Sequence, residues 1–433
     1  MSINTSVPGV YIEENASPSI SVSPGGTAVP LFIGRFKPIK SELAGVITRI
    51  SSWLEYTTLF DATLSSAAYV TIKEPCDFAG FGAYDPLASL SLKLYFQNGG
   101  GFCYVYPYPY PYVYQEYGVT PPELNELQEL VDNVGDITLL ACTEVDEPCC
   151  TKVYTALSEL LNKSKGYFLL ANSADGNVPA GISPSSRVAV YYPDVAVPYI
   201  RKFDDKDVTV IYIGHWSNSL EWCRQHADKK MGTLCDKYLN TEIPKPSYIP
   251  PSALMAAVYC KTDRERGVWK APANVVLSGV NDVSVRVTDD AQGVMNTAGV
   301  NVIRYFTGRG VTVWGARTLE ADSDDWRYIP VRRLFDAAER DIKKALQSMV
   351  FEPNSQPTWK RVQAAVENYL YHLWKQGGLA GDKEEEAYFV RIGKDITMTD
   401  DDINQGKMII QVGMAAVRPA EFIILQFTQD LGQ

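Results

Sequence analysis

The chain has 433 residues, of which 46% are hydrophobic and 21% are charged, and its formal net charge is −11. This length predicts two or three domains, and the composition is that of a folded protein. The acidic balance argues against a general nucleic-acid binder, which carries a basic excess. No apolar run reaches the ~18 residues of a membrane-spanning helix, so no direct membrane insertion is expected. The first residues also lack the basic and apolar regions of a secretory signal.

The cysteine and histidine content predicts neither a metal site nor a cofactor site. The eight cysteines are scattered and form no CxxC pair, which is typical of reduced, mostly buried thiols in a cytosolically folded protein. Cys149 and Cys150 are adjacent but lack a second ligand pair nearby. His226 lies between Cys223 and Cys235, yet these three candidates fall short of the four ligands of a structural zinc site.

Residues 1–22 are interpreted as an extended N-terminal arm. Pro8-Gly9 has turn chemistry, a short β-prone run follows it, and later prolines disfavour a helix. Residues 23–325 are then expected to form one core domain.

The core domain alternates helices with short apolar strands, which indicates α/β layers. The predicted helices cover 51–60, 86–101 and 152–162. The predicted strands cover 29–34, 102–106, 136–142, 166–172 and 187–193. We therefore expect an α/β (α+β) fold with mixed sheets and flanking helices.

Two stretches interrupt this alternation and are interpreted as insertions, at about 107–135 and 194–250. The first opens with the Tyr/Pro-rich segment 107–123. We expect this segment to be an exposed extended loop, the alternative being a polyproline-like ligand for another protein. The second insertion contains a strand at 208–214, a helix at 219–230 and a proline-rich linker.

A C-terminal domain of helices and strands is expected at 326–433. Pro330 suits the first turn of a helix, and apolar residues recur after it at helical spacing. The predicted helices and strands cover 330–349, 357–376, 406–417 and 421–427. Chain ends are generally frayed and polar, whereas the last of these strands is apolar. Such a strand can pair with an exposed sheet edge, and that edge can belong to another molecule. This favours an assembly protein over a catalyst.

Charge is distributed unevenly within the C-terminal domain. Residues 331–375 carry eight Lys/Arg against five Asp/Glu, a net +3, and residues 382–402 carry three against eight, a net −5. Opposed patches suit head-to-tail contacts between identical subunits, which generate rings or helices, whereas ordinary solvated surface is the alternative. The basic residues assigned to the exposed face of the first helix are Arg332, Arg333, Arg340, Lys343 and Lys344.

No catalytic residues are predicted. His215, His226 and His372 are the only histidines, and they form no recognisable nucleophile–base arrangement. The GxSxG and GxxxxGK[ST] strings are missing from the sequence. A hydrolase hidden in the α/β core is therefore the weaker alternative.

Long motifs along most of the chain resemble the contractile tail sheath proteins of phages and phage-tail-like injection machines. The motifs are PGVYIEE, YFQNGGGFCYVY, VAVYYPDV, PPSALMAAVYCKTDRERGVWKAPAN, GVNVIRYFTGRGVTVWGARTL, WRYIPVRRLFDAAERDI and RPAEFIILQF. Ala253 and Asp194 depart from the residues common in that family. The length is most similar to sheaths of extracellular injection particles of the antifeeding-prophage or Photorhabdus virulence-cassette type.

The resemblance implies a structural subunit that stacks as six-subunit rings into a helical tube around an inner tube and contracts. Its implied partners are further copies of itself, the inner tube protein, baseplate and tail-terminator or cap proteins, and sheath paralogues. It implies assembly in the bacterial cytoplasm and release within an extracellular particle or virion tail. A myophage tail sheath is the nearest alternative, and a static tube or capsid protein is a more distant one.

The resemblance also assigns roles to the chain ends and to the basic helix. The N-terminal arm and the C-terminal strand are expected to add to the sheets of neighbouring subunits and so complete their C-terminal domains. The linking residues are Val10, Tyr11, Ile12, Phe422, Ile423, Ile424, Leu425 and Phe427. The five basic residues of the first C-terminal helix are expected to hold an acidic inner tube.

Overall fold

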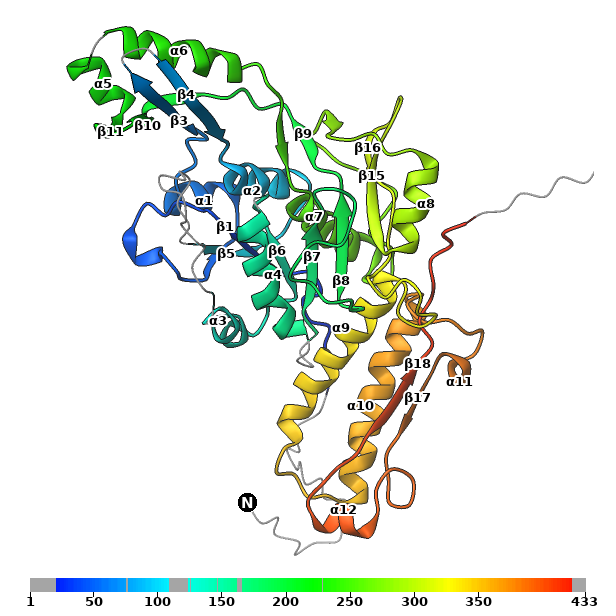
Figure 1. Cartoon of the computed structure of the whole chain (residues 1–433). Helices are drawn as coiled ribbons and strands as arrows, with labels where there is room; N and C mark the ends of the chain where they lie inside the picture. The colour runs from blue at the N-terminus through cyan, green and yellow to red at the C-terminus, as the bar shows by residue number, and fades with distance from the viewer. Residues whose placement is uncertain are drawn as a thin grey trace, which may run out of the picture. The chain divides into compact units, whose positions relative to one another are not determined.

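The computed structural model describes residues 21–74, 77–108, 124, 126–145, 147–161, 166–227 and 229–422 (Figure 1). Within these residues the chain forms two compact units. The larger unit contains 26–337 and 417–422, and the smaller unit contains 21–25 and 338–416. The sequence suggests a domain boundary at residue 326. The observed division comes later, inside helix α9 (Ile329–Leu346).

The larger unit is built on a nine-stranded mixed sheet in the order β13-β16-β15-β8-β7-β6-β1-β5-β2. In that order the strands are Val275–Val276, Gly310–Val313, Val300–Phe306, Val188–Tyr192, Phe168–Asn172, Leu139–Cys142, Pro30–Gly34, Cys103–Pro107 and Thr48–Ile50. The six strands from β15 to β5 run parallel, and β13, β16 and β2 complete the sheet in antiparallel pairs. This mixed sheet confirms the expected α/β class.

The parallel strands are apolar because helices cover both faces of the sheet. Phe32 of β1 packs in the same cluster as residues of α1, α2 and α7. Its neighbours Leu31 and Ile33 pack in a second cluster with residues of α3 and α4, as alternation along a strand requires. The five helices are α1 (Trp53–Leu59), α2 (Leu87–Gln97), α3 (Leu127–Val134), α4 (Glu147–Leu161) and α7 (Ser252–Arg266).

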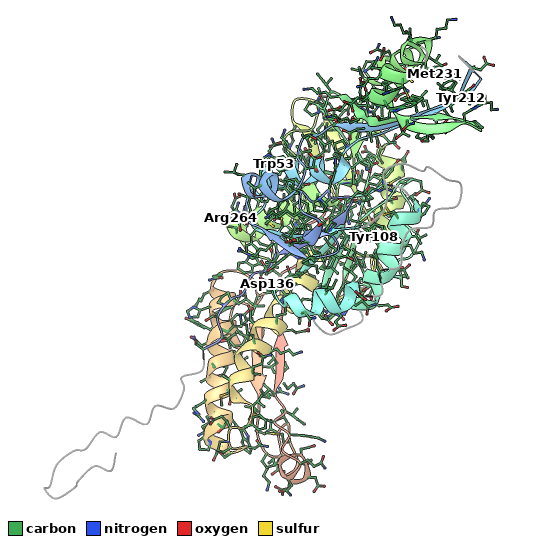
Figure 2. All side chains as sticks on the ribbon, turned by 90° about the vertical axis from the view of Figure 1, so that its left-hand side faces the viewer. Trp53, Tyr108, Asp136, Tyr212, Met231 and Arg264 are labelled. Carbon is green, nitrogen blue, oxygen red and sulfur yellow. The ribbon has the colours of Figure 1, made fainter. Side chains whose placement is uncertain are left out.

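A second sheet has the order β11-β10-β3-β4. Its strands are Trp216–Ser219, Phe203–Tyr212, Ser66–Glu74 and Asp77–Tyr84, and it packs with helices α5 (Leu220–His226) and α6 (Lys229–Glu242). In Figure 2, Tyr212 and Met231 lie together in this part, away from Trp53 of helix α1. The segment interpreted as an insertion at 194–250 therefore shares a sheet with an earlier part of the chain, because its longest strand, β10, pairs in parallel with β3.

The sequence predicts no strand at 66–84 and a single helix at 219–230, and the structure differs at both places. Gly80 and Gly82 weaken the strand signal of β4, and β3 finds its second partner more than a hundred residues away in β10. The helix ends at His226 and a new one begins at Lys229.

Smaller elements complete the larger unit. A three-stranded sheet pairs β12 (Ser247–Ile249), β9 (Val195–Val197) and β14 (Asp282–Val283) in that order. Helix α8 (Asp289–Thr297) precedes β15, and its N-cap Thr288 accepts a hydrogen bond from the backbone of Ala291.

The smaller unit consists of the C-terminal part of α9, α10 (Gln356–Lys375), α11 (Glu384–Ala387), α12 (Asp400–Asn404) and an antiparallel pair of strands, β17 (Tyr388–Arg391) and β18 (Gln411–Met414). Val362 of α10 and Met398 are buried in its core. The two predicted C-terminal helices are thus confirmed, and the predicted strand at 406–417 contains the shorter β18. Across the described residues, helices with the length and apolar character needed to cross a membrane are absent.

Candidate functional site at the C-terminal helix and the chain ends

The expected basic face of α9 is wrong for two of its five residues. Arg332 and Arg333 are only 6% and 3% exposed. Helical periodicity places both arginines opposite the apolar stripe, where solvent exposure is expected. In the structure both are buried, because they form ion pairs with acidic residues of the same unit. Arg340 is half-buried, and Lys343 and Lys344 are exposed.

Arg333 joins α9 to the end of α7. Its Nη2 atom donates to Asp263 Oδ2 at 2.6 Å and its Nη1 atom donates to Asp263 Oδ1 at 3.0 Å. Nη2 also donates to the backbone carbonyl of Thr27 at 3.0 Å, and the guanidinium lies over the Tyr259 ring at 4.5 Å. This bidentate geometry is the strong form of a charged hydrogen bond.

Arg332 belongs to a second buried network. Its Nη2 atom donates to Asp336 Oδ1 at 2.8 Å, and Arg187 donates to the same oxygen from Nε at 3.1 Å and from Nη2 at 2.9 Å. The Arg332 guanidinium also lies over the Trp326 ring at 4.1 Å. The first half of α9 is therefore tied to the larger unit, which explains why the smaller unit begins later along the helix.

The second half of α9 belongs to the smaller unit and contacts the described end of the N-terminal segment. Asp341, which is 8% exposed, accepts hydrogen bonds from the Gly25 backbone at 3.0 Å and from the Tyr369 hydroxyl at 2.8 Å. Burial raises the pKa of the Asp341 carboxyl above its ordinary value. Residues 343 and 344 are on the following turn, with both lysine side chains exposed.

Most of the expected linking residues lie outside the described residues, namely Val10, Tyr11, Ile12, Ile423, Ile424, Leu425 and Phe427. Phe422 is described, and its side chain is 71% exposed. Single exposed apolar side chains are common on protein surfaces, so the exposure of Phe422 alone does not identify an interface.

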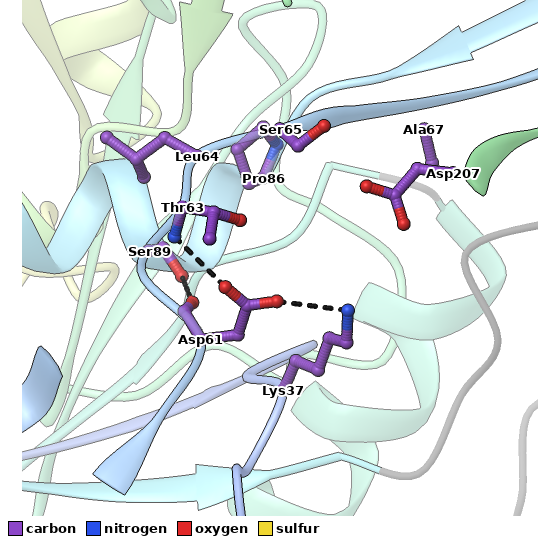
Figure 3. Close-up of a pocket in the computed structure, with 9 residues that line it drawn as sticks. All are labelled: Lys37, Asp61, Thr63, Leu64, Ser65, Ala67, Pro86, Ser89 and Asp207. Atoms are coloured by element: carbon purple, nitrogen blue, oxygen red, sulfur yellow. Dashed lines mark hydrogen bonds and ion pairs between the residues drawn. The ribbon is translucent and has the colours of Figure 1, made fainter. Parts of the chain in front are cut away.

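Two hollows in the larger unit bear on the alternative of catalysis. Figure 3 shows the smaller, of about 70 Å³, in which Lys37 and Asp61 face each other. Lys37 Nζ lies 3.0 Å from Asp61 Oδ2, and the Thr63 backbone donates to Asp61 Oδ1 at 3.0 Å. Burial alone would raise the pKa of Asp61, but these bonds outweigh it and lower that pKa. A carboxylate already paired in this way is a poor general base.

The second hollow, of about 430 Å³, lies at the carboxyl ends of β6, β7 and β8, where open α/β sheets commonly bind ligands. Burial raises the pKa of Asp194 in this hollow to about 7. Two further polar groups of this hollow have partners: Ser173 Oγ donates to the Asn177 carbonyl at 2.6 Å, and Cys150 Sγ donates to the Glu144 carbonyl at 3.2 Å. The residues that line the hollow include no histidine.

The histidines occupy three separate places. His215 stacks on Tyr212 at 4.1 Å, His226 stacks on Trp222 at 4.9 Å, and His372 lies exposed on α10. Cys223 of α5 and Cys235 of α6 are buried as free thiols. In the described part of the chain, no three His, Cys, Asp or Glu side chains gather as a metal site would require.

Two domain models of one family match consecutive parts of the chain. The phage tail sheath protein central domain matches residues 208–319, and the phage tail sheath C-terminal domain matches residues 321–430. A sheath protein of the anti-feeding prophage, solved as a helical sheath in the contracted state, is 57% identical, with a TM-score of 0.76. That comparison covers 99% of this chain and 100% of the other. The chain belongs to the phage tail sheath family.

Two further members of the tail sheath family are also similar to this chain, at lower identity. A chain of the PVC sheath complex, an extracellular contractile injection system solved in the contracted state, is 38% identical over 99% of both chains, with a TM-score of 0.70. The tail sheath protein of Vibrio phage KVP40 is 23% identical over 42% of this chain. The chain thus spans about a quarter of that phage protein's length, since the match covers 26% of it.

The motif PPSALMAAVYCKTDRERG of this tail sheath chain has a clear structural role. Ser252 is the first residue of α7, and its Oγ atom donates to the Cys142 carbonyl at 2.7 Å while its backbone N–H donates to Asn172 Oδ1 at 2.8 Å. Ten residues of the helix are then buried, and Asp263 at its far end binds Arg333. Sequence reasoning missed Asp263 because it lies seventy residues before Arg333. It also missed Asp336, although this residue is four positions after Arg332 on the same helix, a spacing that predicts an ion pair.

Proposed function

We propose that this protein is the sheath subunit of a contractile injection particle. It polymerises into a helical tube of six-subunit rings around an inner tube, and contraction drives that tube through a target envelope. The observation that carries the proposal is the 57% identity, over essentially the whole chain, to a chain of a contracted helical sheath and to a chain of a baseplate of the anti-feeding prophage. The proposed partners are further copies of the chain, the inner tube, the baseplate, terminator or cap proteins, and sheath paralogues.

The protein acts mechanically and not as an enzyme in this proposal. Its free energy of contraction comes from the difference between two packings of the same subunits, stored when the sheath assembles, so no nucleotide is consumed. Two observations support this: Asp61 in the smaller hollow is already paired, and the three histidines are dispersed. We place its assembly in the bacterial cytoplasm, before release within an extracellular particle.

The chain ends link the subunits. Residues 1–22 form the N-terminal arm, residues 23–325 the core domain, and residues 326–433 the C-terminal sheath domain. Val10, Ile12, Ile423, Leu425 and Phe427 have the alternation needed to face a shared core when added to a neighbour's sheet. Main-chain hydrogen bonds then hold while the subunits rotate and slide.

Fewer basic residues are proposed to contact the inner tube than the sequence suggests, and those that remain lie at the exposed end of α9. Lys343 and Lys344, with the half-buried Arg340 beside them, remain in the proposal. Arg332 and Arg333 leave it, because their charges are matched inside the larger unit. Single exposed pairs contribute only about 0–1 kcal/mol, but a sheath repeats them in every subunit, and weak contacts release readily during sliding.

Electron microscopy of the purified assembly tests the proposal. We expect tubes of two diameters, one extended around an inner tube and one wider and shorter after contraction. A single diameter under all conditions would favour a static tube or capsid protein, and a monodisperse monomer with hydrolytic activity would favour the enzyme alternative.

A further inference from the structure

Glu421 occupies a polar socket in the larger unit, one residue before the end of the described chain. Arg317 donates to the Glu421 carboxylate from Nε to Oε1 at 3.0 Å and from Nη2 to Oε2 at 2.8 Å. Asn296 Nδ2 donates to Oε1 at 2.8 Å, and the Tyr328 hydroxyl donates to Oε2 at 3.1 Å. Both oxygens of this side chain are therefore bound by donors from three separate segments.

The socket is held in place by buried bonds of its own. Arg317 Nη1 donates to the Asn296 carbonyl at 3.2 Å. The Arg317 backbone exchanges two hydrogen bonds with the side chain of Asn301, at 2.7 Å and 2.8 Å. Asn301 is fully buried in β15 and also donates to the Val190 carbonyl of β8. The donors around Glu421 are thus positioned by the main sheet.

Among the described residues 417–422, no other side chain is bound to the larger unit as strongly as Glu421. The ion pair between Arg418 and Asp325 is 3.6 Å long, and its side chains are 56% and 81% exposed. Phe422 on the other side is 71% exposed. The Arg317 and Glu421 side chains, by contrast, are 13% and 21% exposed. Bidentate, partly buried pairs of this kind are stronger than exposed ones.

We propose that Glu421 is the anchor of the C-terminal linking strand, and that its carboxylate transmits the pull of that strand to the main sheet of its own subunit. The inference rests on the proposed function, in which the residues after it pair with a neighbouring subunit. A strand joined to a neighbour links two bodies only when its other end is fixed. In this arrangement Glu421 is a positioning residue, and Arg317, Asn296 and Tyr328 are its holders.

The experiment compares the full-length chain with Glu421→Gln, which keeps the shape and removes the charge, and with Arg418→Gln as the matched control. We expect Glu421→Gln to need an about tenfold higher protein concentration to form tubes, which corresponds to about 1.4 kcal/mol per added subunit. Arg418→Gln should assemble like the wild type. Hydrogen exchange of the amides at 417–422 in the unassembled chain should be faster only in Glu421→Gln.

A second variant separates anchoring from folding. Arg317→Lys keeps the positive charge but loses the planar fork, so it should assemble less well than the wild type and better than Glu421→Gln. The thermal midpoint of each unassembled variant shows whether the body still folds. If the wild type forms tubes and Glu421→Gln forms them equally well with unchanged exchange at 417–422, the anchor is wrong while the proposed function stands. If the wild type itself forms no tubes, the proposed function fails.

Discussion

The Arg333 guanidinium binds both oxygens of the Asp263 carboxylate, with the shorter contact at 2.6 Å and both side chains more than nine-tenths buried. The pair connects the first turns of α9 to the last turn of α7, two elements that the family motifs carry. An arginine that a helical wheel places on the surface is therefore part of the interior. This changes which mutations are expected to affect folding and which are expected to affect assembly.

Breaking the buried pair should destabilise the monomer. We expect Arg333→Met to lower the free energy of unfolding by about 3–5 kcal/mol, since it leaves the Asp263 charge buried without its partner. Urea unfolding of the unassembled chain measures the loss. The double variant Arg333→Met/Asp263→Leu should recover much of it, and an equal or larger loss in the double variant would contradict the pairing.

Reversing the exposed lysines should affect assembly instead. Lys343→Glu/Lys344→Glu is expected to leave the free energy of unfolding within about 0.5 kcal/mol of the wild type, because exposed substitutions seldom do more. The occupancy of the inner tube in purified particles should fall. Lys360→Glu, at an exposed position of α10, serves as the control. Unchanged occupancy in the double variant would exclude these lysines from the tube contact.

Removing either chain end should uncouple folding from assembly. Deleting residues 1–16 or residues 423–433 is expected to leave a soluble monomer that forms no tubes, since each deletion removes a strand proposed to pair with a neighbour. The second deletion keeps Glu421 and its socket. Sedimentation and electron microscopy report the two properties separately, and normal tubes from either truncated chain would refute the linking role.

Asp194 should make stability depend on pH near neutrality. Burial raises its pKa from about 3.8 to about 7, so the folded chain keeps a proton that the unfolded chain loses over this range. The stability that this proton contributes is fully present below the unfolded pKa of about 3.8, and it is lost as the pH rises through the folded pKa of about 7. Asp194→Asn avoids that loss, and its advantage over the wild type should grow between about pH 4 and pH 7, by roughly 2–4 kcal/mol.

The matched control for this prediction is Asp175→Asn in the same hollow. Hydrogen bonds from the side chain and backbone of Asn177 lower the pKa of the Asp175 carboxyl. This substitution should therefore bring no gain at neutral pH. Unfolding measured in urea across the pH range decides the matter, and a parallel pH profile for Asp194→Asn and the wild type would contradict the assignment.

The sequence by itself determined the α/β class, most strands of the main sheet and the two long C-terminal helices. Runs such as 29–34 and 166–172 are almost entirely apolar, and a short run of this kind is typical of a strand covered on both faces. The apolar stripe after Pro330 fixes a helix in the same way, because its spacing of 3.6 residues matches no other element. These signals are local, so one sequence is sufficient to read them.

Only the tertiary structure decided what depends on partners distant in the chain. Strand β3 pairs with β10, which is more than a hundred residues later in the chain. Arg333 binds Asp263, which is seventy residues before it. Glu421 meets Asn296, Arg317 and Tyr328 only when the chain folds back on the main sheet. Charge and periodicity show that such side chains are polar, but burial and pairing are properties of the space around them, which no local pattern encodes.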